Sequence, residues 1–106
     1  MSWTAHAAII YGWDVTEDLR KIPEEKIDDF WDALYQTSEY ICDAVSNDFL
    51  FIGTVISDIC EDESAIPMNI TDLDWNLMRY RAYHSLEASG LKKITEPKLY
   101  HICYYC

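Results

Sequence analysis

The apolar residues of this chain follow two different periods, and the order in which those periods alternate restricts the fold more than any other feature. Strand-like runs rich in apolar, aromatic and β-branched residues cover residues 5–13, 40–45, 49–59 and 99–106. Helical spacing of three and four residues runs through residues 23–37 and again through residues 71–90. Because side chains repeat every two residues in a strand and every 3.6 in a helix, the predicted order is β-α-β-β-α-β.

This order predicts an α+β fold, a ferredoxin-like βαββαβ sandwich with two helices on one face of a four-stranded antiparallel sheet. The competing prediction is another α+β arrangement, with an additional short strand or helix in the acidic loop at residues 61–69. No repeat or linker interrupts the 106 residues, so we expect a single domain that spans residues 1–106. A chain of this size buries roughly two-thirds of its unfolded surface and needs no metal or disulfide to hold a core.

Residues typical of turns and caps set the expected limits of these elements. Pro23 begins the first helix, and Gly90 ends the second helix, whose start is predicted to be capped by Thr71 with Asp72 and Asp74. A hairpin turn is expected at residues 46–48, and Gly53 marks a bulge or a close approach of two backbones.

Charge is distributed unevenly along the chain. There are 19 Asp and Glu residues against 8 Lys and Arg, a formal net charge of −11. Residues 14–76 hold 17 of the acids and 3 of the bases, whereas residues 77–106 hold 2 acids and 5 bases. Contacts to phosphate need Lys or Arg, so this balance excludes a general binder of nucleic acid or of an anionic membrane.

The first predicted helix carries a row of carboxylates on the face opposite its apolar residues. This carboxylate row consists of Glu24, Glu25, Asp28, Asp29 and Asp32. Like charges four residues apart cost roughly 0.2–0.5 kcal/mol per pair, and a face that served only solubility would mix both signs. A second acidic group follows the predicted hairpin and consists of Asp58, Glu61, Asp62 and Glu63.

Carboxylates fixed on a rigid helix imitate the charge of a nucleic-acid backbone, and complementary fields select a partner. We therefore expect both acidic groups to bind a basic surface of another protein, such as a nucleic-acid-processing or defence complex. In size and composition the chain resembles phage-encoded inhibitors of host defence or DNA-processing enzymes, which occupy the channel where nucleic acid would lie. This resemblance implies a DNA-mimicking inhibitor that is not an enzyme and uses no cofactor.

Residues 5–13 lack the preceding bases and the following cleavage pattern of a signal peptide, and the run is too short to span a membrane. We expect a cytoplasmic protein, in the host cytoplasm if it is encoded by a phage, without direct contact to nucleic acid or membrane.

An alternative function is a small-molecule-binding or sensor module that acts as a homodimer through its aromatic sheet face. Trp13, Tyr100 and Tyr104 would line the pocket of such a module. The acidic surface would then serve solubility alone.

The four cysteines leave other chemistries open. Cys103 and Cys106 have the spacing of half a zinc site, which His101 and His6 could complete, although the sequence has no second pair of this kind. The first and last strands are predicted to be antiparallel neighbours, which places His6 nearer than His101 to Cys103 and Cys106. A Cys–His nucleophile pair would then be within reach, but the surrounding net negative charge would disfavour its thiolate form. No nucleotide-binding, nucleophile-elbow or zinc-protease motif occurs in the sequence. We therefore expect small apolar side chains at these positions and no metal site.

Overall fold

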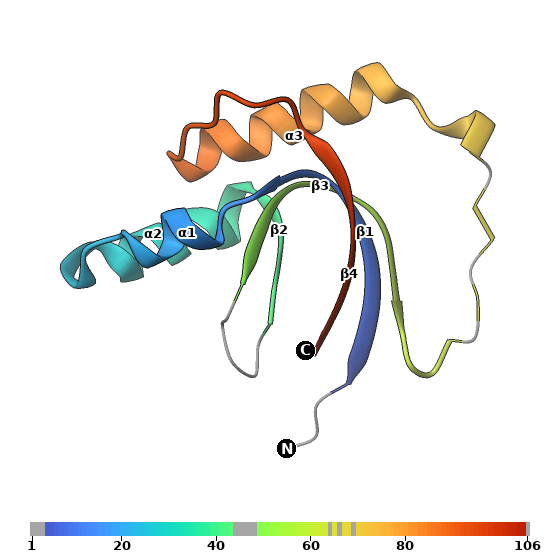
Figure 1. The fold of residues 1–106 in the computed structure, drawn as a ribbon, viewed down its shortest axis with the longest axis horizontal. Helices are drawn as coiled ribbons and strands as arrows, with labels where there is room; N and C mark the ends of the chain where they lie inside the picture. The colour runs from blue at the N-terminus through green and yellow to red at the C-terminus, as the bar shows by residue number, and fades with distance from the viewer. Residues whose placement is uncertain (1–3, 44–48, 64, 66, 69, 106) are drawn as a thin grey trace.

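The computed structural model describes residues 4–43, 49–63, 65, 67–68 and 70–105. Its elements, shown in Figure 1, are β1 (Ala5–Asp14), α1 (Thr16–Arg20), α2 (Glu24–Thr37), β2 (Glu39–Cys42), β3 (Leu50–Cys60), a 3-10 turn (Ile70–Asp72), α3 (Trp75–Ser89) and β4 (Lys98–Tyr105). The four strands form one antiparallel sheet in the order β2-β3-β1-β4. An α+β fold with a four-stranded antiparallel sheet is therefore confirmed.

The number of helices differs from the prediction, because the described residues form three α-helices where two were expected. The additional helix, α1, follows β1 directly, whereas the competing prediction placed an extra element in the acidic loop. Asp14 sets its start, since the carboxylate oxygen Oδ1 accepts hydrogen bonds from the backbone N–H and the hydroxyl of Thr16, at 3.0 and 2.6 Å. A ferredoxin-like arrangement is thus not confirmed.

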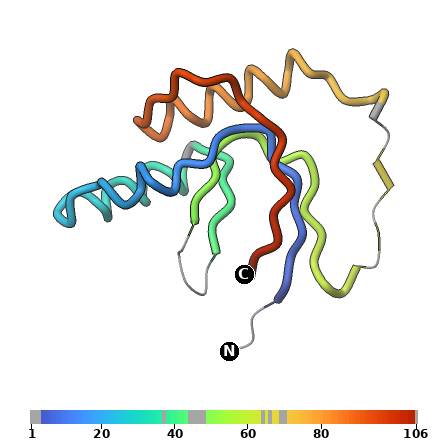
Figure 2. Tube along the Cα trace, in the orientation of Figure 1, coloured from blue at the N-terminus to red at the C-terminus, as the bar shows by residue number. Residues whose placement is uncertain are grey.

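The sheet arches strongly (Figures 1 and 2), and two of its strands carry facing glycines. Gly12 of β1 pairs with Gly53 of β3. A Cβ atom on Gly12 would lie 2.0 Å from the backbone oxygen of Ile52, and one on Gly53 would lie 2.2 Å from that of Tyr11. The predicted close approach at Gly53 is confirmed, whereas the bulge in this strand pair lies between Ile9 and Ile10.

The arch gives the protein two apolar clusters, one on each face of the sheet. The cluster beneath the helices consists of Trp13, Val15, Leu34, Leu50, Ile52, Ala82 and Leu86. The cluster on the opposite, inner face consists of Ala8, Ile10, Ile41, Ile102 and Tyr104. Across this inner face the rings of Phe51 and Tyr100 lie 4.9 Å apart, so the chain fills much of the face that the sequence predicted to be open.

The ends of α3 follow ordinary capping rules, with one correction to the prediction. The N-cap is Asp74, whose carboxylate accepts a hydrogen bond from the backbone N–H of Leu77 at 3.1 Å. Asp74 is thus confirmed as a capping residue, whereas Thr71 and Asp72, which were predicted to cap the helix with it, lie in the preceding 3-10 turn. Gly90 ends the helix with φ of 80°, a left-handed conformation that glycine adopts without strain.

Candidate functional site

Helix α2 projects beyond the sheet and packs mainly on α3 (Figure 1). Among the described side chains of α2, Leu34 alone is fully buried. The other residues of the predicted apolar face, Ile27, Phe30 and Trp31, are only half-buried. The apolar face of this helix therefore packs on the core but is only partly covered by it.

All five carboxylates of the predicted row are exposed on α2. None of them has an ion-pair partner within the described part of the chain. Acids on neighbouring elements behave differently, because Glu17 and Asp18 of α1 pair with Arg20 and Lys93 at 2.5 Å each. Within the part of the chain that the structure describes, the carboxylates of the row are therefore left without ion pairs.

The two arginines of α3, Arg79 and Arg81, also form ion pairs within the chain. Arg81 binds Glu39 at 2.8 Å, and Arg79 binds Glu96 at 2.5 Å while lying 5.0 Å from the ring centre of Tyr83. The hydrogen bond from Arg79 lowers the pKa of Glu96, and the same bond raises the pKa of Arg79. These pairs leave the arginines of α3 engaged away from the carboxylate row.

An aromatic stripe, Phe30, Trp31 and Tyr35, lies along α2 beside the carboxylates. Trp31 stacks on Tyr35 with ring centres 5.8 Å apart and meets Phe30 edge-on at 5.7 Å. Tyr35 is 62% exposed. Because residues three apart are neighbours on a helix surface, Asp28 lies next to Trp31 and Asp32 lies next to Tyr35.

Phe30 and Trp31 also pack against the core cluster beneath the helices, as the sequence pattern predicted. The pattern did not identify the exposed part of this stripe as a binding surface. Composition could have indicated such a surface, because Trp and Tyr, which combine an apolar ring with a polar group, are enriched in protein interfaces.

The second acidic group does not form one patch. Asp58 accepts a hydrogen bond from the hydroxyl of Tyr104 at 2.5 Å, and its other oxygen lies 3.2 Å from Nδ1 of His6. Glu63 accepts hydrogen bonds from the backbone N–H and the thiol of Cys60, at 3.3 and 3.4 Å. Two of the four carboxylates are thus used within the fold.

The remaining two, Glu61 and Asp62, are exposed in the turn after β3. This turn and α2 lie at opposite ends of the long axis of the molecule (Figure 1). The nine predicted residues therefore do not make a continuous surface, and only the row on α2 is brought together.

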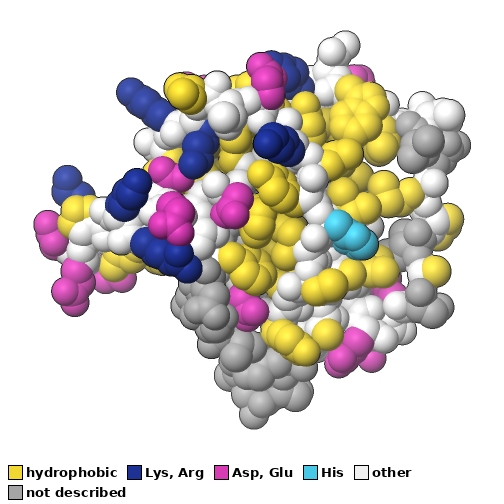
Figure 3. Space-filling model, in the orientation of Figure 1, with side chains coloured by type: hydrophobic (Ala, Val, Ile, Leu, Met, Phe, Trp, Pro, Cys, Tyr) yellow, Lys and Arg dark blue, Asp and Glu magenta, His cyan; other side chains and the backbone are white. Residues whose placement is uncertain are grey.

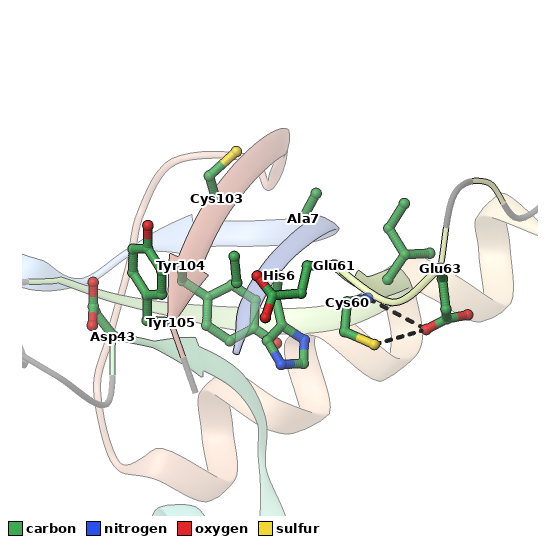
Figure 4. Close-up of a pocket in the computed structure, with 11 residues that line it drawn as sticks. His6, Ala7, Asp43, Cys60, Glu61, Glu63, Cys103, Tyr104 and Tyr105 are labelled. Atoms are coloured by element: carbon green, nitrogen blue, oxygen red, sulfur yellow. Dashed lines mark hydrogen bonds between the residues drawn. The ribbon is translucent and has the colours of Figure 1, made fainter. Parts of the chain in front are cut away.

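A pocket of about 370 Å³ opens at the end of the sheet where β1, β3 and β4 meet (Figure 4). His6 pairs with Tyr104 in β4 and with Cys60 in β3, while Cys103 pairs with Ala7. Successive side chains of a strand point to opposite faces, and Figure 4 shows Cys103 pointing away from His6. The predicted approach of His6 and Cys103 is therefore correct in register, but the two side chains do not meet.

The thiol at this pocket is paired with a carboxylate. Cys60, which shares a face with His6, donates a hydrogen bond to Glu63, and a carboxylate does not favour the thiolate as a cationic neighbour does. Within the described residues no group of three His, Cys, Asp or Glu has the geometry of a metal site. Cys106, the other half of the predicted zinc pair, lies outside the described residues.

The aromatic pocket of the alternative function is not assembled either. Trp13 lies under the helices, where its indole N–H donates to the backbone oxygen of Thr95 at 2.9 Å and its ring meets Tyr83. Tyr100 and Tyr104 belong to the cluster on the other face of the sheet. The three residues proposed to line one pocket are therefore separated by the sheet.

No helix among the described residues has both the length and the apolar character needed to cross a membrane. No family model matches the chain, and searches of curated proteins and of solved structures found no match.

Proposed function

We propose that this chain is a non-enzymatic binding protein whose α2 docks on a basic, nucleic-acid-binding surface of a partner protein. One observation carries the proposal. The carboxylate row is exposed and uncompensated beside a half-exposed aromatic stripe, whereas acids on α1 are paired within the chain. A helix evolved only to cover the core would bury the stripe and mix charges on its outer face.

The charge density of the row suits imitation of nucleic acid. At about 1.5 Å of rise per residue, Glu24 and Asp32 are separated by roughly 12 Å along the helix axis. Five carboxylates over that length give one negative charge per ~2.4 Å, compared with one per ~1.7 Å in duplex DNA. A surface built to hold phosphates therefore attracts α2, as it does in the phage-encoded DNA mimics that the composition resembles.

The two parts of the surface have different roles in this proposal. The carboxylates accelerate the encounter and orient the helix, an effect that salt weakens. Trp31 and Tyr35 supply the apolar area that holds the complex after docking. In the second acidic group, Asp58 and Glu63 form hydrogen bonds within the chain, and we propose no role for them in binding. Glu61 and Asp62 are the two members that could contact the edge of the partner.

We further propose that the fold is a variant of the ferredoxin-like arrangement. The support is the order β1, helix, β2, β3, helix, β4, which is retained if α1 and α2 together are counted as the first connection.

The test is affinity purification from the native host, with identification of the proteins retained by the tagged wild-type chain. The decisive variant reverses Asp28→Lys, Asp29→Lys and Asp32→Lys, and the matched control reverses Glu61→Lys and Asp62→Lys. We expect a partner with a basic nucleic-acid-binding site, which the control retains and the triple variant loses. Its binding should weaken steeply between 50 and 200 mM salt, the range over which phosphate-mimicking contacts are screened.

A partner retained equally by the triple variant would contradict the proposed role of α2. So would a partner that still binds its nucleic acid while saturated with this protein.

A further inference from the structure

Strand β4 lies at the edge of the sheet, and among the described residues it pairs with one strand only, β1. It is eight residues long, whereas the opposite edge strand, β2, has four. Backbone groups of an antiparallel strand point alternately to its two sides, so about half of the N–H and C=O groups of β4 face outward. A free edge of this length can pair with another strand.

The sequence of β4 lacks the devices that usually prevent such pairing. After Lys98 the strand contains no Lys, Pro, Gly or acidic residue. The helices do not cover it, since α3 packs mainly on β1, β2 and β3.

On the uncovered face of β4, Leu99 and Tyr105 are 53% and 51% exposed, and His101 and Cys103 between them are exposed as well. Figure 3 shows hydrophobic side chains gathered in the middle of the molecule, where β4 runs in Figure 1, with charged groups mostly to one side and above.

We propose that β4 pairs antiparallel with β4 of a second copy of this chain, joining two sheets into one of eight strands. The distribution of charge favours a second copy of the chain as the partner of β4. Each chain carries a net charge of −11, so two copies repel one another over most of their surfaces. Residues 98–105 hold no carboxylate, and here two copies meet without opposing their acidic groups. A basic protein of the kind that α2 attracts would have no carboxylate to pair with on this strand.

The symmetry of such a pair fixes its register. A two-fold axis perpendicular to the sheet keeps each side chain on its own face, so the axis must pass through a residue rather than between two. An axis through Ile102 places Leu99 opposite Tyr105, and His101 opposite Cys103, of the second copy. An axis through His101 would set Tyr105 against Pro97, which has no N–H to donate. The axis through Ile102 is therefore favoured.

The test exploits the predicted contact between His101 and Cys103 of the second copy. Both side chains are exposed in the single chain, so substitutions there leave the core intact. In this register position 101 of each copy faces position 103 of the other. The variant H101K/C103K therefore places lysine against lysine at both of these contacts, which should repel. The matched variant H101K/C103E places lysine against glutamate at both contacts, and it does so only in this register.

The measurement is sedimentation velocity under reducing conditions over a range of protein concentrations, with circular dichroism to verify folding. We expect the wild type to sediment as a dimer, with twice the 12.4 kDa mass of one chain. The dissociation constant of the dimer should rise roughly tenfold in H101K/C103K, and the dimer should be recovered in H101K/C103E. A wild-type chain that remains a monomer throughout would overturn the proposal, as would a dimer insensitive to H101K/C103K or a failure of H101K/C103E to recover it. Reversal of the carboxylates on α2 should leave the dimer intact, which separates this inference from the proposed function.

Discussion

At the scale of single residues, Asp58 shows how a carboxylate in an acidic protein is used by the fold. It accepts the hydroxyl hydrogen of Tyr104, a side chain only 8% exposed, and it lies beside His6, whose ring stacks on that of Tyr104 at 4.9 Å. We predict that Tyr104→Phe lowers the free energy of unfolding by about 1–2 kcal/mol, because a hydrogen bond to a charged group is lost while the ring stays packed. Urea denaturation measures this loss. Tyr105→Phe is the control, since the 51% exposed Tyr105 should change stability by less than about 0.5 kcal/mol, and equal effects of the two variants would contradict the assignment.

The same residues define what sequence could predict at this scale. Register between the first and last strands was inferred correctly, and it put His6 near Cys103. Whether two such side chains meet depends on which face each one occupies, and a one-residue offset sends them to opposite sides. Likewise the sequence pattern placed Asp58 and Glu63 in an acidic group. It could not show that the two carboxylates accept hydrogen bonds from Tyr104 and Cys60 within the fold.

At the scale of elements, the start of α3 depends on one capping side chain. Asp74 accepts the N–H of Leu77, and Asp72 lies two residues earlier in the 3-10 turn. We predict that Asp74→Ala lowers the free energy of unfolding by about 1 kcal/mol, the usual cost of a lost N-cap. Thermal or urea denaturation against Asp72→Ala, which should be nearly neutral, provides the comparison. If Thr71→Ala proved the more damaging change, the helix would begin where the sequence pattern first placed it.

Elements with many periodic residues were predictable, and those without were not. The four strands and both long helices follow from hydrophobic spacing and from Pro23 and Gly90. Helix α1 is five residues long, too short for a period to be recognised, and its start depends on Asp14 contacting Thr16. For α2 the pattern defined the polar and apolar faces correctly. It could not show that the apolar face stays half-exposed, because that depends on how far the neighbouring elements extend.

At the scale of the whole molecule, curvature decides which surfaces remain free. The facing glycines Gly12 and Gly53 permit the close approach at which the sheet arches, and the arch lets the inner face fill itself with side chains. Sequence alone identified Gly53 as special but not its pairing with Gly12. A flat sheet would expose the inner aromatics, whereas the arched one packs them against one another and leaves α2 and the edge at β4 among the accessible surfaces.

Charge links binding and stability over the whole chain, because the carboxylate row is maintained against its own repulsion. Asp28 lies four residues from both Glu24 and Asp32, so Asp28→Lys replaces two repulsive pairs with two attractive ones. We predict that this variant is more stable than the wild type by about 1 kcal/mol at low salt, measured by urea denaturation. The gain should shrink as salt screens the exposed charges.

Asp28→Asn is the matched control and should give about half of that gain, since it removes repulsion without adding attraction. A destabilised lysine variant would mean that Asp28 has a role in the fold. If the prediction holds, the row lowers the stability of the free chain, and a surface that costs stability is retained for what it binds.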